Sequence, residues 1–300
     1  MMAWILRAIT LAQLLLSIAI ARWLLASAQA SWLAIAALAV ALMLLLHLTI
    51  IVAEFALSRF SASKAPPTQT ISTLGWLRAI GGEFTSSWTS FAIRIPLFGN
   101  QPLASAPAAT RTPIVFIHGY FCNRAVWRPL AAHLARAGHA IGSVNLEPAF
   151  GSIDDYPALI DQQIRALQAN HASHKVILIC HSMGGLAARA YLRRYGNEAI
   201  DRVITLGTPH QGTALALHGH GKNVREMRRD SAWRRELEGS ESRATGALFT
   251  TILSHHDNMV SPQAGQTIPG AQTIEFAGLG HVRLLLDRKV WSAIDKMLTR

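Results

Sequence analysis

The sequence predicts an α/β domain, with a mainly parallel sheet covered by helices on both faces, preceded by two apolar helices that anchor it in a membrane. From residue 112 onward, short apolar runs alternate with segments of helical periodicity, which is the pattern of strands joined by helical crossovers. No charged residue occurs from Leu24 to Ala53. Beyond the anchor, about 240 residues remain, a normal size for one domain with a full core.

Residues 1–59 are expected to form a transmembrane helical hairpin. Residues 4–25 and 32–53, at about 1.5 Å per residue, are long enough to cross a hydrocarbon core of about 30 Å. Arg7 and Arg22 interrupt the first stretch near its ends, where long side chains reach the interface. A cleaved signal peptide is the competing interpretation, but Arg22 argues against it and the second stretch would still leave one span.

Positive charges flanking the hairpin predict its orientation. Arg7, Arg59 and Lys64 outweigh Arg22 near the loop, so the positive-inside rule favours both ends of the hairpin in the cytoplasm. We therefore expect the protein in the inner membrane of a bacterium, with its α/β domain on the cytoplasmic side.

Residues 60–111 are expected to connect the anchor to the catalytic domain. Apolar residues around Trp76 predict a juxtamembrane amphipathic helix. The run Phe91–Ile95 predicts one early strand, and a Pro/Ala-rich linker is expected at residues 101–110. No catalytic residue is expected in this segment.

The first strand of the domain is predicted at Thr112–Ile117, and it runs directly into His118-Gly119. A strand that ends in His-Gly suits an oxyanion hole, in which two backbone N–H groups hold the negative oxygen formed during acyl transfer. We expect these donors to be Tyr120 and Met183, with Phe121 as the alternative to Tyr120. His118 itself is expected to be a loop histidine bound to local backbone.

The next elements continue the alternation. Residues 127–138 have apolar residues at helical spacing and a closing glycine, and a strand follows from His139. Ser152 is the expected N-cap of a further helix that ends near Asn170, with Asp155 in the capping-box position.

Ser182 is the predicted nucleophile. It lies in Cys-His-Ser-Met-Gly-Gly at 180–185, directly after a buried strand that begins at Lys175 and directly before a helix. A sharp turn between strand and helix lifts the hydroxyl clear of its own backbone. Cys180 departs from the usual Gly-x-Ser-x-Gly pattern, because it places a Cβ where the elbow normally has glycine.

The catalytic acid and base are expected after the serine. A strand at 247–254 ends in a polar turn that contains Asp257, and a strand at 272–277 leads to a glycine loop that contains His281. In an acyl transfer site, an imidazole takes the proton of the serine and a carboxylate fixes its tautomer. We therefore assign Asp257 as the acid and His281 as the base.

Other residues compete for these two roles. His255 and His256 adjoin Asp257 but leave the turn in different directions, and each remains an alternative base. Glu275 and Asp201 are expected to be surface or capping charges rather than the acid.

Four motifs in order resemble those of bacterial lipases and esterases of the α/β-hydrolase superfamily: His118-Gly119, the segment 180–185, Gly-Thr-Pro-His-Gln-Gly-Thr at 207–213, and Gly280-His281. The resemblance covers residues 112–300 and implies an α/β-hydrolase fold with a cap at about 212–246. It also implies a serine carboxylic-ester hydrolase that acts on lipid-like acyl esters without a cofactor. An acyltransferase with the same triad, or a non-catalytic membrane scaffold, are the alternatives.

The expected cap is basic. Its cationic residues are Lys222, Arg225, Arg228, Arg229, Arg234 and Arg235. Such a surface either meets anionic lipid or forms a solvated helix face. His210, His218 and His220 invite a metal site, but no Cys or carboxylate set completes it, so none is expected.

Composition restricts the partners. The formal net charge of +11 favours contact with anionic lipid, whereas no nucleic-acid-binding motif appears. The two cysteines, Cys122 and Cys180, give no disulfide framework and are compatible with a reducing compartment. The expected partners are a membrane and an acyl ester or lipid substrate, and protein partners are not predicted.

Overall fold

A computed structural model describes residues 1–106, 108–171, 173–241 and 243–299. Four positions within the predicted segments lie outside these residues. They are Pro107 in the expected linker, Ala172 and Arg300 in the expected domain, and Ser242 in the expected cap.

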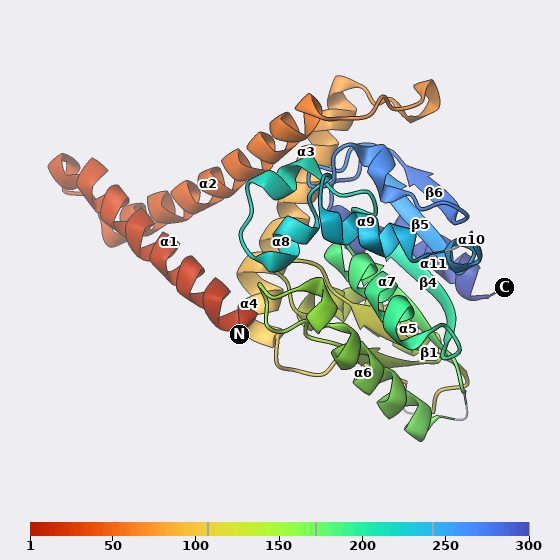
Figure 1. Cartoon of the computed structure of the whole chain (residues 1–300). Coiled ribbons are helices and arrows are strands. Elements are labelled where there is room, and N and C mark those ends of the chain that lie inside the picture. The colour runs from red at the N-terminus through yellow and green to blue at the C-terminus, as the bar shows by residue number, and fades with distance from the viewer. Residues whose placement is uncertain (107, 172, 242, 300) are drawn as a thin grey trace.

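Six parallel strands form the sheet of the domain (Figure 1). In chain order they are β1 Arg111–Ile117, β2 His139–Ser143, β3 Val176–His181, β4 Ile200–Leu206, β5 Phe249–Ser254 and β6 Gln272–Phe276. Their order across the sheet is β2-β1-β3-β4-β5-β6, and every neighbouring pair is parallel. The predicted parallel sheet is therefore confirmed.

Helices cover both faces of this sheet, and its central strands β1 and β3 are buried along most of their length. Val115 in β1 joins a buried cluster with the helices α6 Pro157–Asn170 and α7 Met183–Tyr195. Its neighbour Ile114 faces the opposite cluster, formed with α5 Arg128–Arg136 and α11 Arg288–Leu298. The expected capping box precedes α6, since Ser152 and Asp155 hydrogen-bond reciprocally around a 3₁₀ turn at Ile153–Asp155.

Between β4 and β5 lie the short helices of the expected cap. They are a 3₁₀ turn at Ala214–Leu217 and the helices α8 Lys222–Glu226, α9 Ala232–Gly239 and α10 Arg243–Gly246. Glu226 of α8 accepts hydrogen bonds from the hydroxyl of Ser152 at 2.6 Å and the N–H of Ile153 at 2.7 Å. These bonds fasten the segment to the start of α6.

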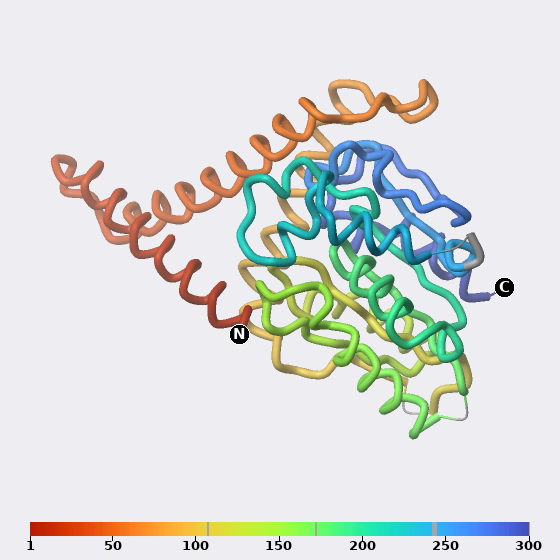
Figure 2. The backbone as a smooth tube through the Cα atoms, viewed as in Figure 1, coloured from red at the N-terminus to blue at the C-terminus, as the bar shows by residue number. Residues whose placement is uncertain are grey.

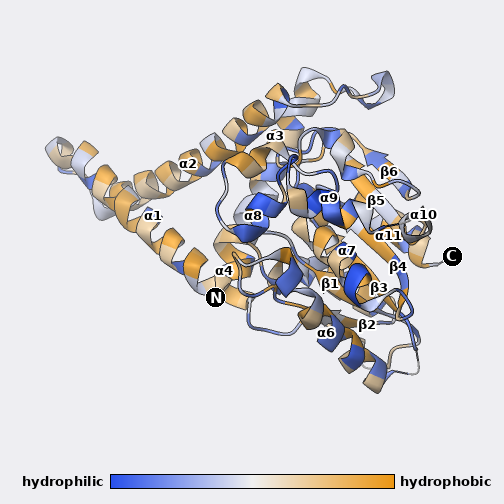
Figure 3. Ribbon diagram, in the orientation of Figure 1, coloured by the Kyte–Doolittle hydropathy of each residue, from blue (hydrophilic) through white to orange (hydrophobic). Residues whose placement is uncertain are grey.

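Two long apolar helices precede the domain and project away from it (Figures 1 and 2). α1 spans Met2–Leu24 and α2 spans Trp32–Phe60, and both are long and apolar enough to cross a membrane. Figure 3 shows hydrophobic residues along both helices. Many of their large apolar side chains are exposed to the surroundings of the protein, including Leu15, Leu33 and Leu45, as expected for helices surrounded by lipid.

The two helices reach the domain at different places. At the start of α1, Met2 and Leu6 join a buried cluster that includes Ile95. Near the end of α2, Ile51 and Phe55 pack with Ala79 of α3 Thr73–Trp88. The helices converge toward their connecting turn and diverge toward the domain (Figure 1).

The prediction of an early strand at Phe91–Ile95 is wrong. The chain there forms a π-helical turn, Thr89–Arg94, followed by α4 Ile95–Phe98. Phe91 and Ile95 are four residues apart, which places them on one face of a helix. Pro96, which has no N–H, fits the first turn of α4. A π-helical turn inside a longer helix is frequent at functional sites.

Candidate active site

Ser182 lies on a sharp turn between β3, which ends at His181, and α7, which begins at Met183. Its backbone angles of φ 54° and ψ −129° lie in a sparsely populated region for a residue with a Cβ, and such strain is a property of nucleophile elbows. The N–H of Ser182 donates to the carbonyl of Leu206 at 2.9 Å. The neighbouring strand β4 therefore helps to hold the strained turn.

Two glycines allow strand and helix to come together at this turn. A Cβ at Gly184 would collide with the carbonyl oxygen of Ile117, and a Cβ at Gly185 would collide with the side chain of Thr208. Cys180, in contrast, is completely buried and contributes to the cluster that contains α6 and α7. A Cβ is thus tolerated at the position where the motif departs from its usual form.

We expect Gly184→Ala to lower the unfolding free energy by roughly 1–3 kcal/mol, because the added methyl group meets backbone that cannot rotate away. Thermal unfolding of the detergent-solubilised protein measures this change. Gly81→Ala is the matched control: Gly81 lies in α3 and nothing lies within 4 Å of its added Cβ, so this exchange should keep or raise stability. Equal melting temperatures for the two variants would contradict the prediction.

Asp257 and His281 lie in contact at the ends of neighbouring strands. His281 Nδ1 is 2.9 Å from Asp257 Oδ2. The other carboxylate oxygen accepts the N–H groups of Met259 and Val260, both at 2.8 Å. Burial by itself would lower the pKa of His281, but the charge and hydrogen bond of Asp257 outweigh it and raise the pKa.

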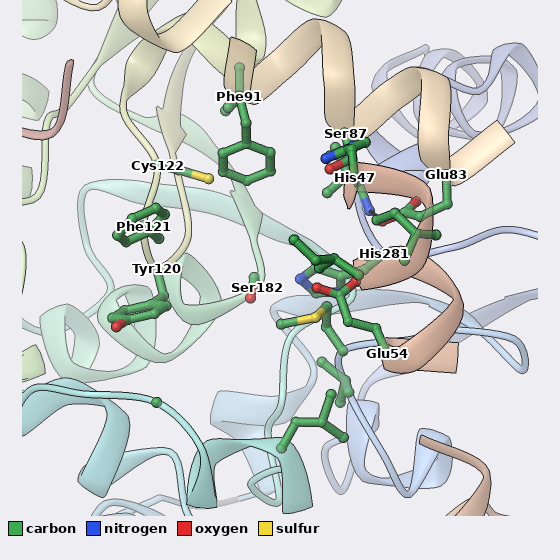
Figure 4. Close-up of a pocket in the computed structure, with 18 of the residues that line it drawn as sticks. His47, Glu54, Glu83, Ser87, Phe91, Tyr120, Phe121, Cys122, Ser182 and His281 are labelled. Atoms are coloured by element: carbon green, nitrogen blue, oxygen red, sulfur yellow. Dashed lines mark hydrogen bonds between the residues drawn. The ribbon is translucent and has the colours of Figure 1, made fainter. Parts of the chain in front are cut away.

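The serine and the histidine face the same cavity (Figure 4). This cavity has a volume of about 520 Å³, within the size range of small-ligand sites. In the part of the chain that the structure describes, no hydrogen bond joins Ser182 Oγ to the imidazole of His281. Such bonds are often long in a free enzyme and tighten when substrate binds.

The predicted oxyanion donors lie beside the serine. A Cβ added to Gly119 would lie 2.7 Å from that of Ser182, so the loop after β1 touches the elbow. Among the described residues, no acceptor is found for the backbone N–H of Tyr120, Phe121 or Met183. Tyr120 also donates its hydroxyl to the carbonyl of His220 at 2.9 Å, which ties the loop to the cap. The choice between Tyr120 and Phe121 stays open.

His118 is bound to local backbone, as expected. Its Nδ1–H donates to the carbonyl of Gly119 at 2.8 Å, and its Nε2 accepts the N–H of Leu146 at 3.0 Å. Burial lowers the pKa of His118 to about 4, so the ring is neutral at physiological pH. It fixes the loop after β1 and is not available as a base.

The competing acids and bases have other partners. His255 pairs with Glu275 at 2.8 Å, and Asp201 pairs with Arg202 at 2.8 Å. His256 Nδ1 accepts the N–H of Gly278 at 3.1 Å. None of these residues lines the cavity that contains Ser182. His210, one of the three histidines considered for a metal, is bonded to Thr205 at 3.1 Å.

Residues that the sequence did not single out hold the loop of His281. Glu83 of α3 is buried and accepts the N–H groups of Val282 at 2.9 Å and Arg283 at 2.8 Å. Asn258 accepts the N–H of His281 at 2.9 Å and donates to Glu54 of α2 at 2.7 Å. Burial raises the pKa of Glu83. The sequence did offer one signal for a structural role of Glu83, since it is the one acid in the otherwise uncharged run 79–93.

Comparisons with known proteins agree with this fold. Residues 112–259 match the family model described as the alpha/beta hydrolase fold. The mature lipase BlEst2 of Bacillus licheniformis aligns with a TM-score of 0.55 and 19% identity, over 67% of this chain and 96% of that one. Aspergillus fumigatus lipase B aligns with a TM-score of 0.58 and 17% identity, over 67% and 56%. The chain therefore has the α/β-hydrolase fold.

By sequence, the chain is similar to lipases. The chain is 34% identical over 123 residues to triacylglycerol lipases of Pseudarthrobacter phenanthrenivorans and Burkholderia plantarii. Each match covers 38% of this chain, and 38% and 34% of the respective relative. The matched region thus spans little more than a third of these curated relatives.

Proposed function

We propose that this protein is a serine carboxylic-ester hydrolase that cleaves acyl esters through an acyl-enzyme on Ser182. The observation that supports this proposal most directly is the arrangement at the cavity, where the strained serine faces the histidine that is paired with a buried carboxylate. An acyltransferase would use the same arrangement, and hydrolysis is favoured over acyl transfer by the similarity to triacylglycerol lipases. No observation favours the non-catalytic scaffold.

The proposed reaction begins when Ser182 Oγ attacks the acyl carbonyl and His281 Nε2 takes the hydroxyl proton. Asp257 stabilises the imidazolium and keeps Nδ1 protonated. The N–H groups of Met183 and of Tyr120 or Phe121 hold the oxyanion. The proton then passes to the departing alcohol. Water, deprotonated by His281, releases the carboxylic acid and restores the serine.

Two facts support a lipid-like substrate. Apolar side chains form most of the lining of the cavity, among them Leu6, Ile51 and Val260. The curated relatives named above are triacylglycerol lipases. We infer that the acyl part of the substrate is a hydrocarbon chain and that the membrane is its source.

Covalent labelling tests the nucleophile and the reaction class together. An alkyl fluorophosphonate should form a phosphorus bond to Ser182 Oγ, release fluoride and block hydrolysis of p-nitrophenyl esters to the same extent. Peptide mass spectrometry would locate the label. Labelling of another residue with parallel loss of activity would contradict the assignment, and turnover of fatty acyl thioesters alone would contradict the ester substrate.

We further propose that α1 and α2 anchor the protein in the inner membrane with the hydrolase domain in the cytoplasm. A green fluorescent protein fused to the C-terminus should fluoresce, and an alkaline phosphatase fused there should be inactive because its disulfides form only in the periplasm. Arg7→Glu should weaken this orientation. An active phosphatase fusion would place the domain on the opposite side.

A further inference from the structure

The active-site cavity continues between the two apolar helices. Its wall includes Ile9 and Thr10 of α1, and Met43 and Ile50 of α2. Along α2, the lining positions run from Leu57 back to Met43, a distance of about 21 Å at the helical rise of about 1.5 Å per residue. The cavity therefore extends from Ser182 into the part of the hairpin that is composed to lie in hydrocarbon.

The divergence of the helices creates this space. α1 is fixed to the domain through Leu6 and through Arg7, whose Nε donates to the carbonyl of Pro96 at 2.8 Å. α2 is fixed separately through Glu54 and through Ser58, whose carbonyl accepts the hydroxyl of Ser261 at 2.7 Å. Because the two attachments lie apart, the helices cannot close on each other at the domain.

The lining between the helices is suited to a hydrocarbon chain. Ile9 and Ile50 are 39% and 42% exposed, so each presents apolar surface that a chain can cover. His47 also lines this part, but its ring packs against Phe84 and Trp88 with centroids 5.2 and 5.4 Å apart. Thr10 and Gln13 are the polar exceptions on α1. Among the described residues that line the cavity, none of those on α1 and none of those from Met43 to Ile51 on α2 is charged.

We propose that the space between α1 and α2 is the acyl-binding site, and that the acyl chain of a membrane lipid ester enters it laterally from the bilayer. This inference rests on the proposed function, because it assumes that the ester carbonyl is presented to Ser182. Most of the lining between α1 and α2 is apolar, so transfer from the bilayer to the site requires little exposure of hydrocarbon to water. The membrane helices are then part of the substrate site as well as an anchor.

Bulky substitutions within and outside the space between α1 and α2, here called the groove, test the proposal on the full-length protein in lipid nanodiscs. Ile50→Trp on α2 and Thr10→Trp on α1 fill the groove. Leu45→Trp and Leu11→Trp are matched controls, since both residues are exposed on the same helices and neither lines the cavity. The substrates are p-nitrophenyl acetate and p-nitrophenyl hexadecanoate, which differ in chain length alone.

Each groove variant should lower kcat/KM for the hexadecanoyl ester by tenfold or more and change that for the acetyl ester less than about twofold, while the controls change neither. An unchanged chain-length preference in both groove variants would overturn the acyl site. A different result would contradict the proposed function, namely cleavage of the acetyl ester that does not depend on Ser182.

Crosslinking of the unaltered protein gives an answer that does not depend on how the variants fold. A long-chain fluorophosphonate with a diazirine at the end of its alkyl chain attaches to Ser182, and illumination then marks what surrounds the chain end. Crosslinks to peptides from residues 8–21 or 37–50 are expected. Crosslinks confined to other parts of the protein, such as the cap, would overturn the proposal.

Discussion

Ser182→Ala should lower kcat for ester hydrolysis at least about a thousandfold, because the variant has no nucleophile to form the acyl-enzyme. The fold should persist. The substitution keeps the Cβ on the strained turn, and among the described residues the hydroxyl makes no hydrogen bond that would be lost. Activity on p-nitrophenyl esters, together with thermal unfolding in the same detergent, measures both expectations. Residual turnover above about one part in a thousand in a protein free of contaminating esterases would be incompatible with catalysis by this serine.

Asp257→Asn should lower kcat by about a hundredfold or more, but by less than Ser182→Ala does, because the nucleophile and oxyanion donors remain. The oxygen of the amide can still accept the N–H groups of Met259 and Val260, but its NH₂ group then faces His281 Nδ1. The imidazole must then carry its proton on Nε2, where it cannot accept the hydroxyl proton.

The pH profile distinguishes this effect from a structural one. His281 acts as a base only when it is neutral, and Asp257 raises its pKa. Without the carboxylate, the largest contribution that raises this pKa is lost and the smaller ones of Glu83 and Glu54 remain. The pKa should therefore fall, and the acid limb of the residual activity should move to lower pH. Asp201→Asn and Glu275→Gln are controls, since both residues are paired elsewhere, and each should retain activity within about twofold. If Asp257→Asn kept full activity and one of the two controls were inactive, the acid would be the residue changed in that control and not Asp257.

The sequence predicted the parts of the structure that depend on local pattern. The strands were recognisable because a buried parallel strand is apolar on both sides, and Ser182 because its strand, glycines and helix are contiguous. The pairing of Asp257 with His281 was predicted from chain order alone, and the two residues do lie in contact. Their catalytic roles, with those of Tyr120 and Met183, remain predictions.

What the sequence did not predict depends on contacts between distant segments. The segment Phe91–Ile95 has the composition of a strand, but its neighbours in space are helices, and it is helical. Glu83 is separated from Val282 by about two hundred positions, so no local pattern could connect them. The extension of the cavity between α1 and α2 likewise follows from where each helix is attached and not from either helix by itself.

The contacts of Glu83 and Asn258 bear on how this protein can be studied. A soluble fragment that begins after α4 is an obvious choice for crystallisation or assay, since β1 begins just beyond it. Such a fragment would lack Glu83, which leaves the N–H groups of Val282 and Arg283 without their acceptor. The loop beside the histidine would lose its support, and low activity of the fragment would say little about the intact protein. Purification should therefore start from membranes and retain residues 1–98.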